Sequence, residues 1–302
     1  MGCASNANSA ISATLSPGFP RMPKTPLLLE TRQRLRELGD QLWCSCLAQE
    51  LLAQGARLVL DNKGDVLAAA AFPNSKKAPR INIRVSELAR FSERTLATGL
   101  GAVITAAYEV CESYCSELPV VLQRLGAREF GYEKRQVPEE TLRTALETAG
   151  VSPIPAEVFL TFKYLRLRRN QIAHLREEPT DELATLVRQR GTHLMRYWGH
   201  EGALDFSAVP RPTLTEQEAM EIHKFLRICV EEIDMAASVV LDVRKVLAEL
   251  DQAIQASHPT LRGPGGQPRR AQKLEAMVEI LYGFDIRPAE ISALLWPRPI
   301  AR

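Results

Sequence analysis

The chain has 302 residues, 45% of them hydrophobic and 25% charged, which is the composition of a soluble protein with core for one large or two small domains. Its formal net charge of +2 excludes a surface dominated by positive field, so any nucleic-acid site must be a local patch. The sequence contains no stretch of about 18 uninterrupted apolar residues and no signal-peptide pattern. We therefore expect a cytoplasmic protein with no membrane partner.

The first 85 residues fall into three segments with different sequence patterns. Residues 1–26 are rich in Ser, Ala, Asn and Pro without periodicity, which predicts a disordered leader. The leucines of residues 27–54 have helical periodicity, and Gly55 is expected to end that helix. Short β-prone runs separated by turn-forming residues follow within residues 57–85. Residues 27–85 are thus predicted to form a helix plus a small β-meander.

From residue 86 the pattern is helical nearly to the end of the chain. Two overlapping capping boxes, Thr213 with Glu216 and Thr215 with Glu218, predict the start of one long helix. Because strands are few and the connections are of modest length, an antiparallel bundle over residues 86–257 is the simplest architecture, in a mainly α protein. The expected helices are 86–118, as one long helix or two abutting ones, and 139–149, 156–176, 181–197 and 213–256.

The C-terminal part reads as a linker followed by a helical hairpin. Residues 258–270 contain Pro259 and a Pro-Gly-Gly run, which favour a linker. Residues 271–302 contain two short helices around a turn, similar to the first two helices of a helix-turn-helix. Few residues remain for a recognition helix, so we interpret this segment as a docking hairpin anchored by Trp296 rather than as a DNA reader.

The six cysteines do not form a recognisable metal site. Cys111 and Cys115 lie at helical i,i+4 spacing in an apolar run, where cysteine behaves as a small buried hydrophobe. No nearby histidine completes a set of four zinc ligands, and disulfides are rare in cytosolic proteins. We therefore expect no metal and no cofactor.

Polar residues are concentrated in the second half of the predicted helix 156–176. Asn170 and His174 are four residues apart and share one helix face. Arg169 lies about 100° around the helix, close enough for its long side chain to reach the same space. One spot can thus receive an amide, an imidazole and a guanidinium, which are groups that bind phosphate or transfer its protons.

The run from Arg169 to His174 has an arginine, a polar residue directly after it, and a histidine a few residues on, near the end of a bundle helix. In these features the chain resembles HEPN domains. The earlier run Ile104–Leu118 is similar to the glutamate-bearing early helix of HEPN groups from bacterial defence and toxin systems. The resemblance covers roughly residues 90–255 and implies a HEPN-like helical bundle; Leu175 stands where many members have glycine.

The resemblance implies a metal-independent endoribonuclease that works as a homodimer, with the motif helices of two protomers meeting at the interface. Cleaving RNA without a metal needs a base for the 2′-hydroxyl, an acid for the leaving 5′-oxygen and cations for the phosphorane. One motif supplies one histidine, so a two-fold axis beside it would supply the second. We assign His174 to proton transfer, Arg169 to phosphate charge and Asn170 to orientation, with Glu109 supporting the motif from the earlier helix.

The basic residues expected to line the RNA path are Lys163, Arg166, Arg168 and Arg176. The resemblance to defence and toxin groups also leaves room for a regulatory protein partner. Two other hypotheses remain open. One is a catalytically inert HEPN-like dimerisation and RNA-binding scaffold, in which Asn170 satisfies the histidine and Glu177 or Glu178 pairs with the arginine. The other is a DNA-binding regulator that uses the C-terminal hairpin.

Overall fold

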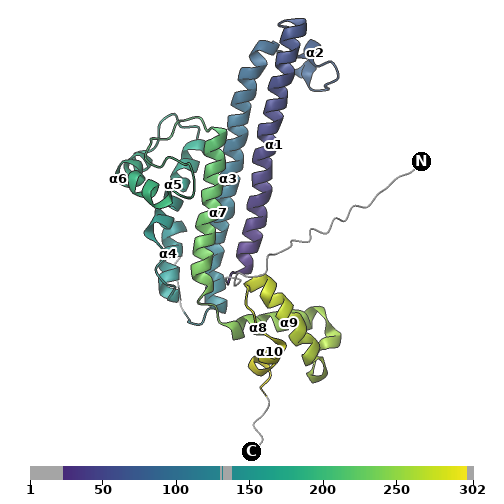
Figure 1. The fold of residues 1–302 in the computed structure, drawn as a ribbon, viewed down its shortest axis with the longest axis vertical. Coiled ribbons are helices and arrows are strands. Elements are labelled where there is room, and N and C mark those ends of the chain that lie inside the picture. Colours follow the sequence, from purple (N-terminus) through teal and green to yellow (C-terminus); the bar gives the residue numbers. More distant parts are fainter. Residues whose placement is uncertain (1–22, 130, 132–137, 298–302) are drawn as a thin grey trace, which may run out of the picture.

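The computed structural model describes residues 23–129, 131 and 138–297, and within these ranges the chain is helical (Figure 1). The expected mainly α bundle is confirmed. The predicted disordered leader, residues 1–26, lies outside the described residues except for its last four. The α-helices of the described ranges are α1 (Pro26–Lys63), α2 (Ala68–Ala71), α3 (Val85–Leu125), α4 (Pro138–Ala149), α5 (Ala156–Ala173), α6 (Asp181–Trp198), α7 (Glu216–Ser238), α8 (Val243–Ser257), α9 (Gln267–Tyr282) and α10 (Pro288–Leu295).

The predicted β-meander is wrong. Gly55 does not end α1, which continues for two further turns to Lys63 because Ala56 and its apolar neighbours pack against α3. The second β-prone run instead forms α2, where four consecutive alanines have the highest helix propensity of any residue. The third run is the loop before α3, and an isolated bridge from Leu67 to Arg84 is the nearest feature to a sheet there. Tertiary packing outweighed the local β propensity.

The two longest helices, α1 and α3, pack side by side over most of their length (Figure 1). Thr25 begins α1: its hydroxyl accepts from the Leu28 N–H and donates to buried Asp234 of α7 at 2.5 Å. Helix α7 runs along their lower half, whereas the upper parts of α1 and α3 project beyond the bundle with α2 at the tip. We call this projection, residues 47–97, the arm.

The predicted helix 213–256 is two helices, α7 and α8, with a turn between Ser238 and Val243. Asp242 stabilises the break because its side chain accepts from the Arg244 N–H and so caps α8. Its own N–H donates to the Leu125 carbonyl at the end of α3, at 2.7 Å. The chain therefore turns where α3 ends and leads into the C-terminal hairpin.

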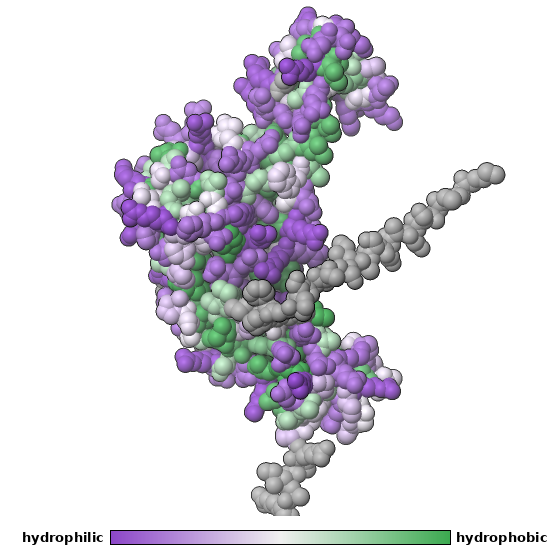
Figure 2. Space-filling model, viewed as in Figure 1, coloured by the Kyte–Doolittle hydropathy of each residue, from purple (hydrophilic) through white to green (hydrophobic). Residues whose placement is uncertain are grey.

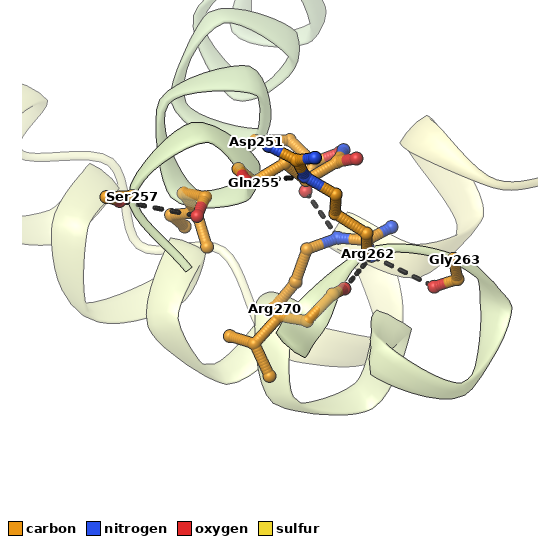
Figure 3. A network of polar contacts seen from close by, with 8 residues as sticks. Asp251, Gln255, Ser257, Arg262, Gly263 and Arg270 are labelled. Carbon is orange, nitrogen blue, oxygen red and sulfur yellow. Dashed lines mark hydrogen bonds and ion pairs between the residues drawn. The ribbon is translucent and has the colours of Figure 1, made fainter. Parts of the chain in front are cut away.

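The C-terminal hairpin α9–α10 is held by a buried arginine, Arg270 (Figure 3). Its Nε donates to Asp251 of α8 at 2.7 Å, one Nη donates to the Gly263 carbonyl at 3.0 Å, and the ring of Trp296 covers its guanidinium at 4.8 Å. The predicted linker therefore contains two 3₁₀ turns and the first turn of α9, ordered around Arg270. Trp296, expected as a docking anchor, packs onto this group.

Candidate functional site

Helix α5 carries the motif and is surrounded on several sides, since it packs against α3, α4, α6 and α7. It begins after Pro155, which is compatible with a helix start and not with its interior. Phe162 and Leu165 are almost completely buried in the common core. A helix enclosed in this way has little free surface, so each of its polar side chains needs a partner or an opening to solvent.

Arg168 is fully buried and belongs to the core. Its Nε donates to Glu218 at the start of α7 at 2.7 Å, and its Nη1 donates to the Gln171 side chain at 2.8 Å. The expected role of Arg168 in an RNA path is therefore corrected, because a guanidinium with no exposed surface cannot reach a phosphate. The sequence did not indicate that Arg168 faces the core while its neighbour Arg169 lies at the edge of the bundle.

Arg169 lies at the edge of the bundle, with 21% of its side chain exposed. Its Nη1 donates to the Asn170 side-chain oxygen at 3.1 Å. Its Nη2 lies 3.6 Å from Glu109 and 3.7 Å from Glu112, both on α3, and its guanidinium lies 5.1 Å from the centre of the Tyr108 ring. The structure thus places Glu109 against the motif arginine, as the sequence predicts.

Tyr108 is the neighbour of Arg169 that the sequence did not indicate. It is 1% exposed, its ring packs 5.6 Å from that of Phe162, and it presents a π face to the arginine. Desolvation by burial raises the pKa of its phenol, so the hydroxyl stays protonated. Its position one residue before Glu109 was the available signal, but an aromatic residue in an apolar run usually serves only the core.

His174 is the C-cap residue of α5, directly after the last helical residue. Its N–H donates to the Asn170 carbonyl at 3.1 Å and its side chain is exposed to solvent. The next residue, Leu175, has φ of 49° and is 82% exposed, and the N–H of Arg176 bonds back to the Gln171 carbonyl. This is a Schellman ending, in which glycine is the usual residue at the left-handed position. The helix therefore ends at Ala173, three residues earlier than predicted, and leaves the imidazole in solvent.

The other expected RNA-path residues lie in different settings. Lys163 donates to Glu182 of α6 at 2.8 Å, and this hydrogen bond lowers the pKa of that carboxyl group. Arg166 is mostly buried and paired with Glu139 of α4 at 2.9 Å. Arg176 is exposed beyond the end of α5. Among these cations, Arg176 is the one that stands in solvent beside His174.

A groove of about 540 Å³ opens beside the end of α5. Its floor is the small-residue face of α3, where Gly101 lies so close to Ile172 that an added Cβ would come within 2.8 Å of it. Sequence reasoning did not indicate this groove, because its walls come from segments far apart in the chain. It is lined by Arg94, Ala97, Thr98, Gly101, Ala102, Thr105, Ile172, Ala173, Leu175, Pro212, Thr213 and Leu214.

No protein-family model, curated protein or solved structure matches this chain. The resemblance to HEPN domains therefore rests on the residues of α3 and α5 themselves.

Within the described ranges, no group of three or more His, Cys, Asp or Glu side chains is placed to hold a metal ion. Burial raises the pKa of the Cys111 and Cys115 thiols, as expected for cysteines packed as core residues. No helix in the described part has the length and apolarity needed to cross a membrane.

Proposed function

We propose that the chain is a metal-independent endoribonuclease of the HEPN type, with its active site at the exposed end of α5. The observation that carries the proposal is the grouping of Arg169, Asn170 and His174. Arg169 and Asn170 are hydrogen-bonded to each other, and His174 follows one turn later with its imidazole in solvent. A phosphate-binding fork and a proton-transfer group thus share one helix end at the protein surface.

The chemistry assigns one task to each side chain. The imidazole of His174 takes the proton of the 2′-hydroxyl, which then attacks the adjacent phosphorus and displaces the 5′-oxygen. Arg169 binds the phosphorane oxygens, whose negative charge increases in the transition state. Asn170 fixes the arginine fork through its 3.1 Å hydrogen bond, and its backbone carbonyl holds the N–H of His174. The products are a 2′,3′-cyclic phosphate and a 5′-hydroxyl end.

A homodimer completes this site, because the leaving 5′-oxygen needs an acid and each chain supplies one motif histidine. Two copies of α5 that meet about a two-fold axis bring two His174 imidazoles and two Arg169 forks into one cleft. The exposed end of α5, with Leu175 and Arg176 in solvent, leaves room for that approach.

Glu109 and Glu112 hold Arg169 in place from α3. Their distances of 3.6 and 3.7 Å are those of loose ion pairs, and both carboxylates have substantial exposed surface. Such partly exposed pairs contribute little to stability. They set the direction of the fork and can give way to a phosphate, which offers it a bidentate partner. In this proposal the two glutamates are positioning residues.

The test is cleavage of single-stranded RNA in excess EDTA, followed by analysis of the product ends. We expect cleavage to persist, to leave 2′,3′-cyclic phosphate and 5′-hydroxyl ends, and to stop when the nucleotide at the cleavage site is 2′-deoxy. His174→Ala and Arg169→Lys should each lower the rate on the order of a hundredfold or more, since a point charge does not replace a bidentate fork. His200→Ala, which removes another exposed histidine, should retain full activity. Metal-dependent cleavage with 5′-phosphate ends would contradict the proposal.

The second candidate is an inert dimerisation and RNA-binding scaffold. It is favoured by the two carboxylates against Arg169, which offset the charge that a phosphate would otherwise meet. Expression in bacterial cells separates the two candidates. An active ribonuclease arrests growth, and His174→Ala relieves the arrest at an unchanged protein level, whereas a scaffold gives the same growth for both chains.

A further inference from the structure

The groove of about 540 Å³ beside the end of α5 adjoins the proposed proton-transfer group. Ala173 and Leu175 both line it, and His174, which lies between them in sequence, is exposed. The rest of the lining comes from the first half of α3 and from residues 212–214, which precede α7. These segments meet where the arm leaves the bundle, and Figure 2 shows hydrophobic atoms among hydrophilic ones at that level. A ligand in this groove would lie directly beside the imidazole.

The lining of the groove has one charged side chain, Arg94, and no carboxylate. Arg94 is exposed, and no ion pair joins it to another residue in the described part of the chain. The other lining residues are glycine, alanine, isoleucine, leucine, proline and threonine. A groove of this composition suits a ligand with an apolar body and a negative charge.

Two threonine hydroxyls add hydrogen-bond acceptors to the lining. Thr98 Oγ1 donates to the backbone carbonyl four residues earlier at 3.0 Å, and Thr105 Oγ1 does the same at 2.9 Å. Both protons are thus used within α3, whereas the oxygens keep lone pairs for donors on a ligand. Nucleobases carry amino and ring N–H groups that are such donors. Their apolar faces can pack against Ile172 and Leu214, which also line the groove.

The groove and the motif share one face of α3. At about 100° per residue, Arg94, Thr105 and Glu109 lie within about 60° of one another around that helix. Glu109 lies against Arg169, so cations stand at both ends of this face. Arg94 and Glu109 are about 22 Å apart along the axis, at the rise of an α-helix. A ligand that meets both cations is extended and has repeated negative charges with flat apolar groups between them, as a single strand of RNA does.

We infer that the groove holds an unpaired base of the RNA, next to the phosphate bound by Arg169, and that Arg94 binds another phosphate of the same strand. The inference rests on the proposed function, from which it takes RNA as the ligand. The substrate class is single-stranded RNA, because a base that is stacked and paired in a duplex cannot enter a groove. No aromatic side chain lines the groove, so aliphatic contacts hold the base and its contribution is smaller than that of stacking.

The first test fills the groove and measures RNA binding apart from catalysis. The probe is a single-stranded 2′-O-methyl RNA of about ten nucleotides, which has no free 2′-hydroxyl and cannot be cleaved by the proposed chemistry. Its dissociation constant is measured by fluorescence anisotropy. Ala102→Phe should raise it about tenfold, because the ring occupies the space of the base. Ala253→Phe, at an exposed position on α8, is the matched control and should have no effect. An unchanged affinity in Ala102→Phe would overturn the inference.

The second test uses salt to separate the phosphate contact from the base contact. Each phosphate contact to a single strand contributes about 0.7 to the slope of log affinity against log salt concentration. Arg94→Ala, a change at an exposed side chain, should reduce that slope by about 0.7. Ala102→Phe should leave the slope unchanged, since no charge is lost. Arg190→Ala, which removes an exposed arginine of α6, is the control. An unchanged slope in Arg94→Ala would show that Arg94 binds no phosphate.

The remaining outcomes separate this inference from the proposed function and from another occupant. Pairing the probe with its complement should weaken binding at least tenfold, and equal binding of the duplex would overturn the inference. A lower mass of Ala102→Phe in light scattering, with unchanged RNA affinity, would assign the groove to a second copy of the chain. If the wild type binds through the groove and cleaves no RNA, the ribonuclease proposal fails and the groove remains an RNA site. If it cleaves RNA and neither variant changes binding, the inference about the groove fails alone.

Discussion

The bundle and the arm are built from the same two helices, yet they bury side chains to very different extents. In the bundle, α1 packs against both α3 and α7, and Leu35 and Leu42 are at most 1% exposed. In the arm, α1 and α3 enclose a small separate cluster of Ala56, Ala71, Val85 and Leu88. The number of neighbouring helices, and not the sequence pattern of α1 alone, decides whether its leucines become core.

The two regions also treat charge differently. The bundle encloses Arg168, and its partner Glu218 is 18% exposed. The arm keeps Arg57 and Asp61 on its outer surface. A buried charge needs its partner in a fixed place, so the surrounding helices keep one arrangement. An exposed charge is solvated and can pair with another molecule. Stability should therefore depend strongly on the charges of the bundle and weakly on those of the arm.

The largest effect is expected for Arg168→Ala, which removes the buried guanidinium and leaves Glu218 and the Gln171 side chain without their partner. We expect a loss of about 3–5 kcal/mol in the free energy of unfolding. Arg57→Ala in the arm is the matched change and should cost less than about 0.5 kcal/mol at concentrations where the chain is monomeric. Urea unfolding followed by circular dichroism gives both values. Equal losses would show that the contrast between the regions is wrong.

A second comparison uses two buried leucines. Leu42→Ala removes a fully buried side chain from the bundle and should cost about 2–5 kcal/mol of global stability. Leu88→Ala removes a side chain from the small arm cluster, where α1 and α3 can separate locally without unfolding the bundle. We therefore expect hydrogen exchange in Leu88→Ala to accelerate within residues 50–97 only. Faster exchange throughout the bundle would contradict this.

The smallest effect is expected at the end of α5, where Leu175 holds a left-handed conformation at φ 49° with its side chain 82% exposed. Leu175→Gly should raise the melting temperature by a few degrees, corresponding to about 1 kcal/mol, because glycine adopts this conformation without strain. Leu175→Ala keeps the Cβ and is the control, with little or no gain expected. A destabilised glycine variant would show that the exposed leucine contributes contacts of its own.

The sequence predicted the helices of the bundle well where local signals and packing agree. The helix predicted at 139–149 begins at Pro138, and that at 181–197 ends one residue later than expected; Thr180 caps its start. Prediction failed at 57–85, where β-prone residues lie in α1 and α2, and at residues 239–242, where Asp242 caps a new helix. In both places a contact with α3 decided the outcome.

The sequence by itself determined which chemical groups lie at the end of α5, and it indicated Glu109 as their neighbour on an earlier helix, where the structure places it with Glu112. Spacing along one helix fixes which side chains share a face. Tertiary structure alone decided that Arg168 is core while Arg169 reaches the surface, that Tyr108 faces the arginine, and that Trp43 and several leucines of α1 stay exposed. Those outcomes depend on which helices pack against each face of α5 and α1. The local sequence pattern does not show which segments far apart in the chain come together in the fold.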